Sequence, residues 1–138
     1  RKIVIIGGGS VGCETADYLA PLINDLFSTN RDITLIEMTN GLMTGESGAT
    51  KSLLTRRMME KGVKIELNSK ITYVDETTIK YEKNNQEYVL NDVDTLVFAV
   101  GYQPISSPIE NAHLIGDCQK VGTLKDAISQ AYQITREI

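Results

Sequence analysis

The residues best suited to chemistry form a glycine-rich run, GGGSVG at 7–12, which fits the pattern G-x-G-x-x-G. The run lies between a short apolar segment, 2–6, and a stretch with helical periodicity, and only in that context does the pattern indicate a nucleotide-binding loop. Gly7 permits a tight turn, Gly9 lets the backbone approach a pyrophosphate, and Gly12 lets the helix pack closely on the strand. The sequence therefore predicts a dinucleotide-binding loop.

Two further features indicate what this loop would hold. The N–H groups near Ser10 and Val11 open the helix, where unpaired amides and the helix dipole attract an anion. Glu37 closes the second apolar run, where an acid accepts hydrogen bonds from the adenosine ribose and repels a 2′-phosphate. Met38 and Thr39 supply no cation for such a phosphate, so the sequence favours NAD(H) over NADP(H). Two other interpretations remain: Glu37 as a solvated strand-end acid, and FAD, which also carries an adenosine ribose, in the same loop.

The elements around the loop indicate an α/β fold. We expect a Rossmann-type parallel sheet with helices on both faces, a β-meander crossover and a C-terminal strand-helix tail. The first helix follows the apolar stripe Val11, Ala16, Leu19, Ile23 and Leu26, with a kink or restart at Pro21. The second runs over 49–61, buries Leu53, Leu54 and Met58, and stops at Gly62. The expected strands are 2–6, 33–37, 63–67, 71–74, 78–81, 87–90 and a central parallel strand at 95–100.

The last third of the chain has a different pattern. A polar, proline-containing linker covers 101–111 and a short strand is expected at 114–117. The last helix begins at Thr123, whose spacing to Asp126 forms a capping box, and its expected buried face is Leu124, Ile128, Ala131, Ile134 and Ile138. We therefore predict an NAD(H)-binding domain over 1–102, followed by a linker and a C-terminal fragment of an FAD-binding domain over 103–138.

Composition excludes several classes of function. A net charge of −4 and a pI near 5.0 argue against nucleic acid, and no apolar run is long enough to span a membrane. The two cysteines, Cys13 and Cys118, have no C-x-x-C spacing and are expected to be free thiols in a reducing cytoplasm. His113 is the only histidine, so the sequence predicts no metal site and no catalytic residue of its own.

Three ordered motifs carry a resemblance to a known family: Ile5–Glu14, Val97–Pro104 and Leu114–Cys118. Together they resemble the NAD(P)-binding domain in the C-terminal region of NADH:flavin oxidoreductases of the old yellow enzyme type. This group includes 2,4-dienoyl-CoA reductase, 2-enoate reductase and trimethylamine dehydrogenase, and it lies within the FAD-dependent pyridine nucleotide-disulfide oxidoreductase superfamily. The resemblance implies that NADH delivers hydride to FAD, with FMN and a 4Fe-4S cluster expected upstream in the parent enzyme.

The resemblance also assigns roles to residues of this chain. Gly7, Gly9 and Gly12 would hold the NADH pyrophosphate and Glu37 its ribose. Glu14 would lie near the nicotinamide end, Gly101 would line the dinucleotide cleft, and Asp117 would contact the FAD ribityl chain.

The partners implied by the resemblance are the FAD domain and FMN barrel of the parent chain. Without them we expect the fragment to be inactive alone and to self-associate weakly through exposed apolar surface. Two alternatives of function remain open: the NAD domain of an NADH oxidase or disulfide reductase, and a non-catalytic NAD-sensing module.

Overall fold

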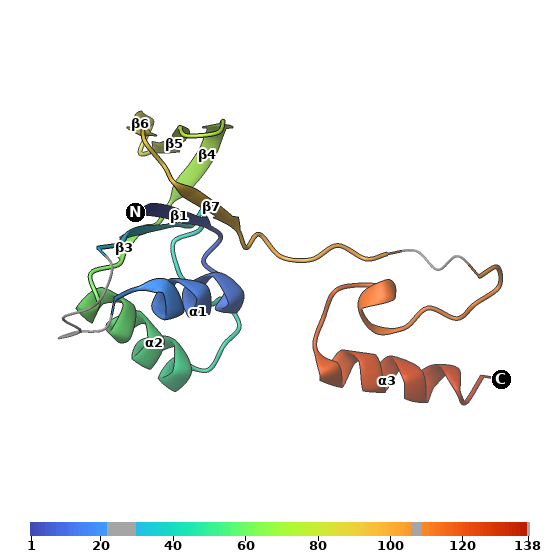
Figure 1. The fold of residues 1–138 in the computed structure, drawn as a ribbon. Helices are drawn as coiled ribbons and strands as arrows, with labels where there is room; N and C mark the ends of the chain where they lie inside the picture. Colours follow the sequence, from blue (N-terminus) through green and yellow to red (C-terminus); the bar gives the residue numbers. More distant parts are fainter. Residues whose placement is uncertain (22–29, 106–108, 138) are drawn as a thin grey trace. The chain divides into compact units, whose positions relative to one another are not determined.

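The computed structural model describes residues 1–21, 30–105 and 109–137 (Figure 1). These residues form two compact units, Arg1–Val100 and Gly101–Ile138, which are described separately. The expected helical positions Ile23 and Leu26, and the expected buried Ile138, lie outside the described residues.

The first unit is built on a four-stranded parallel sheet in the order β3-β2-β1-β7. Its strands are β1 (Lys2–Ile6), β2 (Asp32–Ile36), β3 (Lys64–Glu66) and β7 (Thr95–Phe98). The central strands β1 and β2 are buried on both faces, which explains their continuous apolar runs. The prediction of a central strand at 95–100 is wrong in position: β7 is an edge strand, it ends at Phe98, and the Phe98 side chain is 64% exposed.

The two helices described in the first unit contribute to one core cluster, on the same face of the sheet. α1 (Ser10–Leu19) and α2 (Gly48–Glu60) bury Cys13, Ala16, Leu54 and Met58 against Ile3, Ile5, Ile33 and Leu35. α1 ends at Leu19, because a residue preceding proline is driven into extended backbone, as Ala20 is. The alternative, a helix that restarts after Pro21, lies outside the described residues. Two expected core residues, Val11 and Leu53, are half exposed.

The other face of the sheet is covered by an antiparallel meander. Its strands are β4 (Ser69–Val74), β5 (Ile79–Lys83) and β6 (Gln86–Leu90), and the turn between β5 and β6 falls where the sequence predicts it. Val4, Ile6 and Ile36 point to this face because side chains alternate along a strand, and they pack against Ile79, Tyr81 and Val93. The α/β class with a β-meander is confirmed. Helices on both faces are not found in the described residues, since the meander occupies the second face.

The second unit contains one short 3-10 helix, η1 (Gly116–Cys118), and α3 (Leu124–Ile134). The predicted capping box is confirmed, with Thr123 and Asp126 each accepting from the other's backbone N–H. The predicted strand at 114–117 is wrong: Gly116 has φ +60°, and its N–H donates to Gln130 Oε1 at 2.5 Å instead of to a strand.

The buried face predicted for α3 is also wrong in part. Leu124 and Ile128 are 78% and 62% exposed. The side of α3 that is half-buried carries Ala127, Gln130, Ala131 and Ile134. The reason is that η1 packs against this side, where a Cβ built on Gly116 would lie 3.2 Å from Ala127 Cβ.

Candidate functional site

The glycine-rich loop joins β1 to α1 at the carboxyl edge of the parallel sheet. Gly7 has φ +107°, a conformation that L side chains rarely adopt, and a Cβ there would overlap the Ala99 carbonyl oxygen. A Cβ on Gly12 would overlap the carbonyl oxygen of Gly7. By contrast, a Cβ on Gly9 would meet nothing within 4 Å. Gly7 and Gly12 are therefore needed to form the turn, whereas Gly9 leaves an open surface beside it.

The first N–H groups of α1 are available to a ligand. A helix cannot satisfy its opening amides internally. Gly9 is the N-cap and offers no side chain, and the first turn of α1 contains no acid. In the parts of the chain that the structure describes, the N–H groups of Ser10, Val11 and Gly12 have no acceptor. The start of α1 is consequently suited to receive an anion.

Glu37 lies directly beside the loop, at the end of β2. Its Oε2 accepts from the Gly8 N–H at 2.6 Å and its Oε1 accepts from the Thr39 N–H at 2.7 Å. Partial burial opposes the charged form, but the backbone hydrogen bonds from Gly8, Thr39 and Met38 outweigh it and hold the Glu37 pKa below its ordinary value. Glu37 is therefore a fixed carboxylate at the loop and not a mobile strand-end acid. Since a carboxylate can accept about four hydrogen bonds, it retains lone pairs for ribose hydroxyls.

The segment after Glu37 folds back over the glycine loop. Leu42 and Met43 are buried, and the Met43 N–H donates to the Gly8 carbonyl at 2.7 Å. A Cβ on Gly8 would lie 2.6 Å from Leu42 Cδ2 and 2.9 Å from Glu37 Cβ. Gly8 is therefore required by the fold, although the motif treats its position as variable.

The sequence analysis missed two charged residues, one that contacts the glycine loop and one that lies at the turn following Glu37. Glu46 Oε1 accepts from Ser10 Oγ at 2.7 Å, which places a carboxylate at the first residue of α1. The Lys51 Nζ lies 3.6 Å from where a Cβ on Gly41 would stand, close to the turn that follows Glu37. Neither residue belongs to a motif, and only the folding of 38–47 over the loop brings them there.

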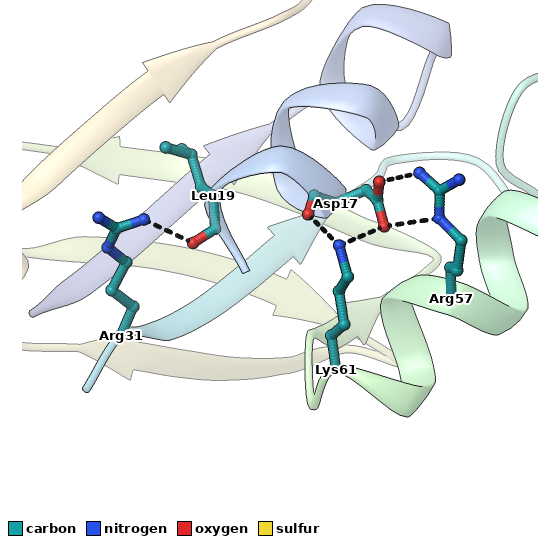
Figure 2. A network of polar contacts seen from close by, with 5 residues as sticks. All are labelled: Asp17, Leu19, Arg31, Arg57 and Lys61. Carbon is teal, nitrogen blue, oxygen red and sulfur yellow. Dashed lines mark hydrogen bonds and ion pairs between the residues drawn. The ribbon is translucent and has the colours of Figure 1, made fainter. Parts of the chain in front are cut away.

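A charged network fixes α1 in place (Figure 2). The buried Asp17 carboxylate pairs with Arg57 and with Lys61 Nζ at 3.0 Å, both from α2 or its end. The Arg57 hydrogen bond is the main reason that the pKa of Asp17 lies below its ordinary value, and Lys61 adds to it. At the end of α1, Arg31 donates to the Leu19 carbonyl at 3.0 Å. These contacts hold the helix whose opening amides have no acceptor in the described residues.

The remaining predicted site residues are not brought to this loop by any described contact. Glu14 is exposed on α1, one turn after the loop. Gly101 and Asp117 belong to the second unit. There Gly101 has φ +98°, and Asp117 Oδ1 accepts from the Gly122 N–H at 3.2 Å. Their assigned roles stay predictions.

The sheet, the glycine turn and the fixed carboxylate define the first unit as a Rossmann-like α/β domain. The chain belongs to the family described as pyridine nucleotide-disulphide oxidoreductase, which matches residues 1–131. The superfamily indicated by the sequence motifs is thereby confirmed.

Individual relatives agree with this family. The chain is 29% identical to a cinnamate reductase of Clostridium sporogenes and 23% identical to an NADH oxidase of Thermoanaerobacter brockii. Both alignments cover 100% of this chain and 21% of the relative. A solved 2-naphthoyl-CoA reductase, in complex with 2-naphthoyl-CoA, has a TM-score of 0.74 at 20% identity, over 99% of this chain and 21% of that chain. The chain thus spans about a fifth of the length of these proteins.

Within the described residues, no helix has the length and apolar character needed to cross a membrane.

Proposed function

We propose that the chain binds NAD(H) and positions it for hydride transfer to FAD within a larger NADH-dependent flavin oxidoreductase. The observation that carries the proposal is the pairing of Glu37 with the glycine loop. One carboxylate oxygen accepts from the Gly8 N–H, and the unpaired amides of Ser10 and Val11 open the next helix. This arrangement combines an anion site with an adjacent ribose acceptor, which is the chemistry that one half of a dinucleotide requires.

The residues present fit such a ligand. The pyrophosphate would lie against the N–H groups of Ser10, Val11 and Gly12, on the surface that Gly9 leaves open. Glu37 would accept from the adenosine ribose hydroxyls. When bound, the nicotinamide supplies a hydride to a flavin. The chain's own contribution is to bind and orient the dinucleotide.

Charge around the ribose acceptor favours NADH over NADPH. The low pKa of Glu37 keeps the carboxylate ionised at neutral pH, and it would repel a 2′-phosphate. Lys51 is a cation close to the turn that follows Glu37. Its Nζ lies near Gly41, and no described contact joins it to Glu37. We therefore expect a preference for NADH that depends on Glu37.

For the whole protein we propose an enzyme of the enoate-reductase type, with FAD contacted by Asp117 and with FMN and a 4Fe-4S cluster in further domains. The names of the relatives support this proposal, since a cinnamate reductase and a 2-naphthoyl-CoA reductase both match nearly the whole chain. The FAD domain and the FMN barrel would be its partners, and the cytoplasm its compartment. An NADH oxidase is the second candidate, because one of the relatives carries that name.

The first experiment is a calorimetric titration of the chain with NADH, NADPH and FAD in parallel. The proposal expects saturable NADH binding, weaker NADPH binding, and a loss of NADH affinity of about tenfold in Glu37→Ala, which removes a charge-assisted hydrogen bond to the ribose. Glu76→Gln, which removes a charge in an exposed turn remote from the loop, serves as the control. Stronger binding of FAD than of NADH would assign the loop to a flavin instead.

A further inference from the structure

Glu46 occupies an unexpected place for an acid beside a site that attracts anions. Its Oε1 accepts from Ser10 Oγ at 2.7 Å, and Ser10 is the first residue of α1. The opening N–H groups of that helix have no acceptor in the described part of the chain, and the Glu46 carboxylate contacts the side chain of the residue that carries the first of them. A carboxylate near the amino end of a helix is stabilised by the helix dipole.

The segment that carries Glu46 is held over the loop by its own backbone contacts. The Met43 N–H donates to the Gly8 carbonyl at 2.7 Å, and the Glu46 N–H donates to the Met43 carbonyl at 3.1 Å. Met43 and Gly45 both have positive φ, at 46° and 98°. Together these features form a tight turn that points Glu46 toward Ser10. The segment ends at Ser47, the N-cap of α2.

A dinucleotide pyrophosphate and this carboxylate would compete for the same positive end of α1. The pyrophosphate carries two negative charges, and like charges a few ångströms apart near a protein surface repel each other. Glu37, the other acid at the loop, is compensated because it accepts from the Gly8 and Thr39 amides and offers lone pairs to the ribose. Glu46 has no comparable role, because a carboxylate cannot donate a hydrogen bond to a phosphate.

We propose that Glu46 is an internal competitor of the dinucleotide phosphates: it docks on Ser10 in the free protein and must leave when the dinucleotide binds. This inference rests on the proposed function, and it names Glu46 as a residue that limits the affinity of the site. Docking of Glu46 keeps the empty loop ordered. Displacing Glu46 costs free energy and therefore weakens net binding of the dinucleotide. The protein then releases its dinucleotide more readily than it would if Glu46 were absent.

The test compares NADH binding by the wild-type chain, Glu46→Gln and the control Glu76→Gln in low-salt buffer, with circular dichroism to verify the fold. Glu46→Gln keeps an acceptor for Ser10 Oγ but removes the charge, and we expect it to bind NADH about three- to tenfold more tightly than wild type. Glu76→Gln should match wild type. The gap should close near 1 M salt, where the Debye length is about 3 Å. An affinity of Glu46→Gln equal to or below that of wild type overturns the inference.

A second measurement needs no variant. Hydrogen exchange of the wild-type chain should become faster in the segment 44–47 when NADH is added, because Glu46 is released, while the glycine loop becomes protected. Protection of both segments overturns the inference.

If the wild-type chain binds no NADH, the proposed function fails first. The same comparison is then made with inorganic pyrophosphate, and equal affinities of Glu46→Gln and wild type for pyrophosphate would overturn the inference as well.

Discussion

Glu37 Oε2 accepts a hydrogen bond from the backbone N–H of Gly8 at 2.6 Å, so the acid at the end of β2 and the glycine loop at the end of β1 form one structural unit. The two strands are paired in register up to Ile6 and Ile36, which brings both residues to the same edge of the sheet. The carboxylate that would bind the ribose therefore also shapes the loop that would bind the pyrophosphate.

This double role predicts that Glu37→Gln destabilises the chain even without a ligand, by about 1 kcal/mol, because a charge-assisted hydrogen bond becomes a neutral one. The Glu37 pKa is lowered in the folded state, so its contribution to stability is present above the pKa of the unfolded chain and is lost as pH falls through the folded pKa. The difference between wild type and Glu37→Gln in urea unfolding should thus be largest near neutral pH and shrink below about pH 4. A difference independent of pH would assign the effect to packing.

The glycines of the loop predict opposite phenotypes for two similar substitutions. Gly12→Ala should destabilise the fold by about 1 to 3 kcal/mol, because its Cβ would overlap the Gly7 carbonyl oxygen. Gly9→Ala should leave thermal stability nearly unchanged, since its Cβ would meet no atom within 4 Å and its φ of −70° suits alanine. Gly9→Ala should instead weaken NADH binding, because the methyl group covers the surface that the pyrophosphate would approach.

Thermal unfolding and NADH titration of both variants check this pair. Loss of stability in Gly9→Ala, or unchanged stability in Gly12→Ala, would contradict the roles that the loop geometry gives to these glycines.

The sequence predicted the glycine turn, the position of Glu37 after the second strand and the approximate ranges of the strands, because each depends on local pattern: glycine spacing and apolar or alternating runs. The predictions failed where packing between elements determines which residues are buried. The run at 95–100 is as apolar as a central strand, yet β7 lies at the edge of the described four-stranded sheet and Phe98 is exposed. The face of α3 depends on where η1 packs, and no pattern in the sequence encodes that contact. Glu46 reaches the loop, and Lys51 lies near Gly41, only because of the way residues 38–47 fold.

The two cysteines should differ sharply in reactivity. Cys13 is buried beneath the glycine loop with its Sγ 3.4 Å from the Gly8 carbonyl, and burial, with Glu37 and Glu14 nearby, raises its pKa to about 11. Cys118 is exposed. Because the thiolate is the reactive form, a thiol reagent such as dithionitrobenzoate at neutral pH should label only Cys118 in the native chain and both cysteines in urea. Native labelling of Cys13, measured by mass spectrometry of peptides, would show that the loop opens.

Two adjacent arginines on α2 offer a sharp test of the network that holds α1. Arg57 pairs with the buried Asp17, whereas Arg56 makes only an exposed pair with Glu60 at 3.6 Å. Arg57→Ala should lower the unfolding free energy measurably, because it leaves a buried carboxylate with one partner fewer. Arg56→Ala should cost at most about 0.5 kcal/mol.

The pH dependence separates this effect from the helix propensity of alanine, which is the same for both variants. The pKa of Asp17 is lowered chiefly by Arg57, so the stabilisation is present above the unfolded pKa of aspartate and is lost as pH falls through the folded pKa. The gap between Arg57→Ala and Arg56→Ala in urea unfolding should therefore narrow in acid. In Asp17→Asn the gap should be small at every pH, since the charge that Arg57 compensates is gone. An unchanged gap in the Asp17→Asn background would mean that Arg57 stabilises the fold through packing of its side chain and not through Asp17.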